Sequence, residues 1–184
     1  MAVVISMLRG VNLAAHRRIP MAPLRGIYES LGLQSPQSYI NSGNVVFKTD
    51  GRDWSRLSAR IEHAIERSFG FRPDVILRTA AELRDAIAAN PFASRPGIDP
   101  SRLLVLFLSG DPGPEARAQV RAIQADPEEL HMRGREIFIY FPNGMGRSKL
   151  SWVALADLLK MSGAGRNWNT VTKLLEIAKA LEAS

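Results

Sequence analysis

The sequence predicts an α+β protein built from two ferredoxin-like halves, of which the second is incomplete. Segments typical of strands and helices in the first 78 residues follow the order β-α-β-β-α-β, which is the split arrangement of ferredoxin-like domains. A similar order begins again after a connector over residues 92–100 that contains proline and glycine. The composition, with 46% hydrophobic and 23% charged residues, is ordinary for a folded globular chain.

In the first half, short apolar runs predict strands, and apolar residues at helical spacing predict helices. Gly32 and Gly70 end the two helices. Ser42-Gly43 predicts a tight hairpin turn, because glycine tolerates the positive φ that such turns require. The predicted segments are strands over residues 3–8, 37–41, 44–48 and 74–78, and helices over residues 24–31 and 54–69.

The second half repeats this pattern in part. A helix that begins at Leu83 is stopped by Pro91, so we place the boundary there, with halves of residues 1–90 and 91–184 packed as one compact unit. The later segments are strands over residues 103–108, 130–133 and 136–141, and helices over residues 116–123, 150–161 and 170–181. Gly163-Ala164-Gly165 is interpreted as a break between the last two helices, which leaves this half without a closing strand.

The composition also limits the classes of function. There is no cysteine, which excludes disulfides, thiolate metal sites and a cysteine nucleophile. No His/Asp cluster or H-E-x-x-H motif is present, so we expect no metal and no cofactor. No apolar run approaches the roughly 20 residues of a membrane helix, and the start of the chain does not resemble a signal peptide, so we expect a cytoplasmic protein without a membrane partner. The net charge of +6 permits an anionic partner, although it equally fits a solvated, arginine-rich surface.

The first candidate site lies where strands of the first half end. The first strand runs towards the end of the sheet at which the second strand finishes and the third begins. The loop after the first strand and the hairpin turn should therefore meet there, bringing together Arg9, Asn12, Asn41, Ser42 and Asn44. Such a group is rich in hydrogen-bond donors and poor in carboxylates, which suits an anion or the edge of a nucleobase. The alternative is that Asn and Ser bond to the turn backbone and Arg9 points to water.

Two further turns are candidates. The segment Pro142–Leu150 follows a strand and opens a helix, so its glycines, together with Arg147, Ser148 and Lys149, could hold an anion at a helix N-terminus. The alternative is a flexible turn in which Ser148 caps the helix. In the last turn, Arg166 and Asn169 are candidate ligand residues; Asn169 or Thr170 could equally cap the final helix, and Trp168 is better explained as a core or interdomain anchor.

As an ordered set, these stretches resemble an uncharacterised bacterial family, the domain of unknown function 1697, over essentially the whole chain. The resemblance rests on Leu8–Asn12, Tyr39–Phe47, Asn90–Phe92, Gly146–Leu150 and Arg166–Val171. Asn41 stands where the family often has Gln, and Leu13-Ala14-Ala15 replaces a more glycine-rich stretch. The resemblance implies two ferredoxin-like halves. It implies no established activity and supplies no catalytic residues.

Three hypotheses about function follow. The first is a module that binds a phosphate-bearing or other anionic ligand, a nucleotide or a nucleic acid, through these turns. The second is an enzyme acting on a small anionic substrate, in which Arg9, Arg147, Lys149 and Arg166 orient the substrate and His16 or Ser42 transfers a proton. The third is a protein-interaction domain whose turns are purely structural.

Overall fold

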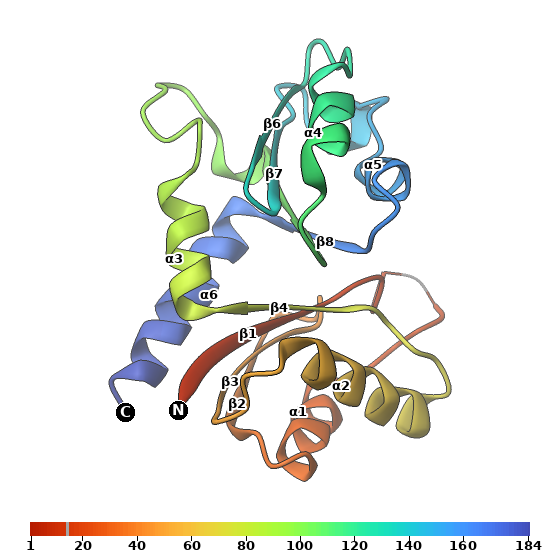
Figure 1. Cartoon of the computed structure of the whole chain (residues 1–184), viewed down its shortest axis with the longest axis vertical. Helices are drawn as coiled ribbons and strands as arrows, with labels where there is room; N and C mark the ends of the chain where they lie inside the picture. Colours follow the sequence, from red (N-terminus) through yellow and green to blue (C-terminus); the bar gives the residue numbers. More distant parts are fainter. Residues whose placement is uncertain (14) are drawn as a thin grey trace. The chain divides into compact units, whose positions relative to one another are not determined.

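The chain forms two compact units, and the final helix is divided between them. The computed structural model describes residues 1–13 and 15–184. Unit 1 comprises residues 1–83 together with 173–184, and unit 2 comprises residues 84–172. The division predicted at residue 90 therefore differs from the structure in two ways: unit 2 begins earlier, and the end of the chain belongs to unit 1 (Figure 1).

Unit 1 has the predicted ferredoxin-like order. Its antiparallel sheet has the strand order β2-β3-β1-β4, and helices α1 and α2 lie on one face of it (Figure 1). The elements are β1 (Ala2–Leu8), α1 (Met21–Ser30), β2 (Gln34–Tyr39), β3 (Asn44–Thr49), α2 (Trp54–Phe69) and β4 (Val75–Thr79), which leads directly into α3 (Ala80–Ala88).

The central strand β1 carries buried apolar residues on both faces of this sheet. Val4 and Leu8 pack with Val45 and Phe47 against the apolar stripes of α1 and α2. Ser6 lies on the same face, where its Oγ is 2.6 Å from the Tyr28 hydroxyl. Burial raises the pKa of Tyr28 well above its ordinary range, although the bond to Ser6 acts in the opposite direction.

The opposite face of the sheet is reached by the end of α6 (Trp168–Glu182). Lys48 lies on that face, since Val45 and Phe47 point towards α1 and α2. Its Nζ donates a hydrogen bond of 2.8 Å to the Ser184 carbonyl oxygen. The C-terminal residues thus complete the layer arrangement of unit 1, with helices on both faces of its sheet.

Unit 2 contains the same arrangement, and the expected lack of a closing strand is wrong. The sheet order is β6-β7-β5-β8, and the closing strand β8 is Gly163–Asn167, paired antiparallel with β5. A Cβ on Gly163 would lie 2.9 Å from Leu106 Cδ1, so β8 uses glycine to lie close to β5. The remaining elements are β5 (Leu103–Leu108), α4 (Gly113–Arg121), β6 (Glu129–Arg133), β7 (Glu136–Tyr140) and α5 (Trp152–Leu158), with single 3₁₀ turns at Pro100–Arg102 and Met145–Arg147.

The helices of both units are amphipathic rather than uniformly apolar. Among the described residues, we find no helix with the length and apolar character needed to cross a bilayer.

Candidate functional site

The two turns predicted to meet at one end of the unit 1 sheet do meet. The backbone N–H of Leu8 donates to the Gly43 carbonyl oxygen at 2.9 Å. The Asn12 side chain donates from Nδ2 to the Asn41 carbonyl oxygen at 2.6 Å. The loop after β1 and the loop between β2 and β3 therefore form one hydrogen-bonded surface.

This junction requires glycine at position 43. Its φ is +81°, and a Cβ there would lie 2.6 Å from Val11 Cγ2 and 2.8 Å from Leu8 Cβ. The turn is longer than the predicted Ser42-Gly43 hairpin, because Tyr39 pairs with Asn44 and four residues, Ile40 to Gly43, separate them. The extra length carries the loop over the end of β1.

The amide side chains hold the loops in place. Asn12 has a φ of +56°; its Oδ1 accepts from the Ile19 N–H at 2.8 Å, and its Nδ2 donates to the Ile19 carbonyl at 2.9 Å. Asn44 is fully buried, and its Nδ2 donates to Ser42 Oγ at 2.7 Å and to the Tyr39 carbonyl at 3.1 Å. Asn12, Asn44 and Ser42 therefore hold the turns together through hydrogen bonds, which is the structural alternative to a role in ligand binding.

The cations at this end of the sheet come from the same loop. Arg9 lies 3.5 Å from the Asp74 carboxylate, and its N–H donates to the Asp74 carbonyl oxygen at 2.9 Å. The Arg17 guanidinium lies 5.5 Å from the centre of the partly exposed Phe71 ring. Arg17 and its neighbour Arg18 are both exposed. The loop therefore offers one guanidinium group over an aromatic ring, and a second exposed arginine follows it in the sequence.

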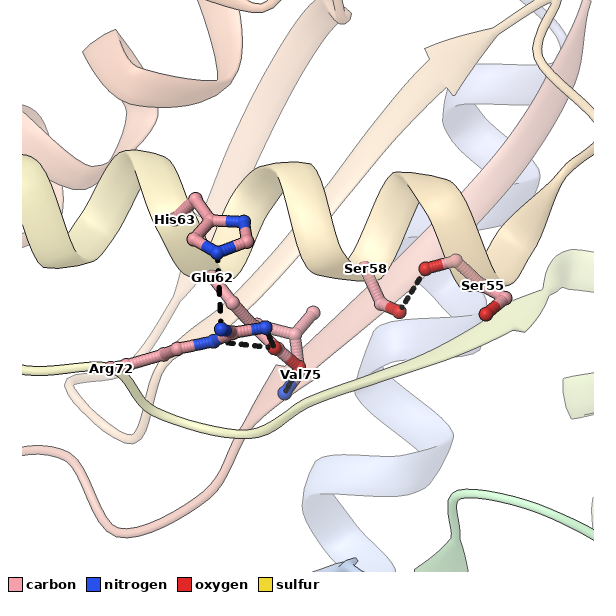
Figure 2. A network of polar contacts seen from close by, with 6 residues as sticks. All are labelled: Ser55, Ser58, Glu62, His63, Arg72 and Val75. Carbon is pink, nitrogen blue, oxygen red and sulfur yellow. Dashed lines mark hydrogen bonds and ion pairs between the residues drawn. The ribbon is translucent and has the colours of Figure 1, made fainter.

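A polar network anchors the segment that carries Phe71 and Asp74 (Figure 2). Glu62 Oε2 accepts from Arg72 Nε at 3.0 Å and Nη2 at 2.8 Å, while its Oε1 accepts from the Val75 N–H at 3.2 Å. His63 Nε2 lies 3.1 Å from Arg72 Nη1. Helix α2 thereby fixes the start of β4, and His63 takes part in this structural clamp.

The turn at residues 142–150 lies in unit 2 and differs from the prediction. Arg147 and Lys149 are exposed, and Ser148 Oγ accepts from the Leu150 N–H at 3.0 Å. Ser148 does not cap a helix: α5 begins at Trp152, and the Ser151 side chain accepts from the Ala154 N–H. Gly144 therefore precedes a single 3₁₀ turn and Gly146 lies within it, so neither glycine is at the N-terminus of an α-helix.

The last candidate turn is divided between β8, which ends at Asn167, and α6, which begins at Trp168. Arg166 is only 8% exposed; burial lowers its pKa to about 10, and Nη1 donates to the Gly165 carbonyl at 2.9 Å. Asn167, and neither Asn169 nor Thr170, caps α6, because its Oδ1 accepts from the Thr170 N–H at 3.0 Å. Asn169 is exposed, and the Trp168 ring packs 6.4 Å from that of Phe138 within unit 2.

Sequence reasoning missed a groove in unit 2 between α4 and β6. It has a volume of about 410 Å³ and is lined by Arg117, Val120, Arg121, Leu130, His131, Met132 and Arg133. The sequence does place Arg117 and Arg121 on one face of a helix, because they are one helical turn apart. It does not show that Arg133 lines the same groove, since that follows only from the order of the strands in the sheet.

Within the described part of the chain, no three His, Asp or Glu side chains gather in a way that could hold a metal ion. The donor-rich turns and the arginine-lined groove both present polar groups suited to binding a ligand.

Comparison with known proteins decides the family. A family model described as "Protein of unknown function (DUF1697)" matches residues 1–138. The chain belongs to this family. Among solved structures, the conserved bacterial protein SP0830 from Streptococcus pneumoniae is similar to this DUF1697 chain at 24% identity, with a TM-score of 0.72, over 97% of this chain and 99% of that one. Among curated proteins no match is found. These likenesses establish the fold and the family without an activity.

Proposed function

We propose that the protein binds a phosphate-bearing ligand, a nucleotide or a nucleic acid, at the end of the unit 1 sheet where the two loops join. We call this region the strand-end surface and define it by Arg9, Arg17, Arg18 and Phe71. The observation that carries the proposal is the guanidinium of the exposed Arg17 over the partly exposed Phe71 ring, with Arg18, also exposed, next to it in the sequence.

The chemistry of this surface suits phosphate esters. Arginine presents a planar set of donors that matches phosphate oxygens and stays charged at every physiological pH. A partly exposed aromatic ring beside cations offers a stacking surface for a base, as in proteins that bind single strands. The loop is held in shape by Asn12 and Gly43 before any ligand arrives, which limits the entropy lost on binding.

Several groups near this surface that could transfer a proton are engaged in structural contacts, and Ser42 Oγ accepts a bond of 2.7 Å from Asn44 Nδ2. His63 is bound to Arg72, and the Asp74 carboxylate is paired with Arg9. His16 is exposed in the same loop as Arg17, so it remains the proton-transfer candidate of the enzyme hypothesis, while the binding proposal rests on the arginines and the ring. A cytoplasmic location, where nucleotides and nucleic acids are abundant, goes with this proposal.

The proposal can be tested with a fluorescein-labelled ten-nucleotide poly-dT strand in fluorescence anisotropy, with ATP and inorganic phosphate as competitors. Replacing Arg17 and Arg18 together by Ala should weaken binding at least tenfold. If both arginines contact phosphates, the slope of log K against log salt concentration should become shallower by about 1.4, since each contact with a single strand contributes about 0.7. Competition by ATP distinguishes a nucleotide site from one that needs a longer strand.

The matched control replaces Arg52 and Arg56, two exposed arginines of the same unit, by Ala. This pair removes the same charge and should change affinity less than twofold. If both double variants weaken binding equally, the loss of affinity reflects net charge and not a site at Arg17 and Arg18. An absence of binding at low salt would refute the proposal.

A further inference from the structure

We infer that the groove between α4 and β6 in unit 2 binds an acidic peptide segment of a partner protein, added in extended form to the open edge of β6. This inference concerns other residues than the proposed phosphate site and does not depend on it. It rests on the shape of the groove, the hydrogen-bonding pattern of its edge and its charge.

The groove follows the edge strand. Four consecutive residues of β6, from Leu130 to Arg133, line one side of it. The other side is one face of α4, formed by Arg117, Val120 and Arg121. A channel between an edge strand and a helix is the setting in which extended peptides join a sheet as an extra strand.

The main-chain groups of β6 alternate in direction. Gly134 and Arg135 form a two-residue turn that closes on the pair Arg133↔Glu136. Such a turn is closed by a hydrogen-bonded pair, and bonding then alternates along the strand. The N–H and C=O groups of Leu130 and Met132 therefore point away from β7, into the groove. Consistently, the Met132 carbonyl accepts a bond of 3.1 Å from Arg133 Nη1.

The charge of the groove selects an acidic partner. Its described lining contains three arginines and no carboxylate. Arg117 is 3.2 Å from Asp111, but that carboxylate is 71% exposed, so the pair is screened by solvent and open to exchange. The His131 ring does not add to the charge on this side, because it packs against Phe92 at 5.3 Å.

The spacing of the arginines fits an extended peptide. Arg117 and Arg121 are one helical turn apart, about 6 Å along the axis. Alternate residues of a strand are about 6.8 Å apart, so two acidic side chains on one face of the peptide can each meet one arginine. The described lining has no aromatic residue other than the engaged His131, and so it lacks the stacking surface that a nucleic acid would use.

The test uses the full chain and a fluorescein-labelled eight-residue peptide of alternating Glu and Val. Anisotropy should show saturable binding that is absent for the matching Lys/Val peptide. Replacing Arg121 and Arg133 together by Glu should weaken binding at least tenfold, while the matched control Arg52→Glu with Arg56→Glu in unit 1 should change it less than twofold.

Two measurements separate strand addition from simple charge attraction. N-methylation of one alternate set of peptide amides should abolish binding, whereas methylation of the other set should preserve it. Hydrogen exchange should show the amides of Leu130 and Met132 protected on binding. Binding without that protection, stronger binding of a poly-dT strand through the same arginines, or no binding of the acidic peptide at low salt would each overturn the inference.

Discussion

The close approach at Gly43 gives the sharpest test of how the strand-end surface is built. Replacing Gly43 by Ala adds one methyl group at a φ of +81°, where it would lie 2.6 Å from Val11 Cγ2 and 2.8 Å from Leu8 Cβ. Neither contact is with the flexible end of a long side chain. The loop must therefore move away from β1, which strains the hydrogen bond between the Leu8 N–H and the Gly43 carbonyl.

The expected loss has two parts. An alanine held at positive φ costs about 1–2 kcal/mol relative to its preferred conformation. Overpacking against a fixed neighbour costs a further 1–3 kcal/mol. We therefore expect Gly43→Ala to lower the free energy of unfolding by about 2–5 kcal/mol, a large share of the total stability of a small protein.

Urea unfolding followed by circular dichroism measures this loss, with Gly70→Ala as the matched control. Gly70 has a φ of +77°, and nothing lies within 4 Å of its hypothetical Cβ, so this variant isolates the backbone contribution. In a double-mutant cycle, Val11→Ala should cost less stability in the Gly43→Ala background than in the parent, because one of the two close contacts is removed. If Gly43→Ala is no more destabilising than Gly70→Ala, or if Val11→Ala shows no coupling to it, the contact between the loops is refuted.

Three other variants probe the same framework. Asn12→Ala should lower the free energy of unfolding by about 2–3 kcal/mol, because it leaves the Ile19 backbone groups without their side-chain partners and places alanine at positive φ. Asn12→Asp keeps the acceptor for the Ile19 N–H, so an equal loss in that variant would contradict this reasoning. Burial raises the pKa of Tyr28 in the folded state, so the stabilising contribution of its protonated form is complete below about pH 10 and is lost as the pH rises further. In urea unfolding at pH 9 to 11, the free energy of unfolding should therefore decline less steeply with pH for Tyr28→Phe than for the parent. Gly163→Ala should lower the free energy of unfolding by about 1–3 kcal/mol, and Leu106→Ala should cost less stability in that background than in the parent, whereas full stability would mean that β8 does not require glycine.

The sequence predicted the topology of unit 1 because each of its elements carries an unambiguous pattern. The strand order then required the loop after β1 and the loop between β2 and β3 to meet, so this convergence follows from the sequence pattern alone. It could not show that Asn12 and Asn44 would be occupied in holding those loops. That depends on the positive φ at Asn12 and on the full burial of Asn44.

The errors in unit 2 have a different cause. Gly163-Ala164-Gly165 has little intrinsic preference for a strand, so the sequence alone predicts a break there. Packing against Leu106 makes a small residue necessary at Gly163, and the segment forms β8. Helical periodicity predicted the final helix but not which sheet it would cover, and the assignment of residues 173–184 to unit 1 was missed. A pattern local to one element carries no information about its partner in space.

The two units share one plan, and corresponding positions show why the acidic peptide is expected at unit 2 alone. Arg78 and Arg166 are both buried at the fourth residue of the closing strand, so the frameworks match. The outer strands differ. In unit 1, β2 contains Pro36 and a register irregularity between Gln34 and Gln37, which are devices that protect an edge from pairing.

The space between the edge strand and the neighbouring helix also differs between the two units. Arg25 of α1 donates a hydrogen bond to Ser38 of β2, which bridges the helix and the edge strand in unit 1. In unit 2 the corresponding strand pairs in regular register and borders an open, arginine-lined groove. Hydrogen exchange in the presence of the Glu/Val peptide should therefore protect Leu130 and Met132 and leave the amides of β2 unchanged. Equal protection of both edges would show that the peptide responds to exposed strands in general and that the arginines of α4 do not select it.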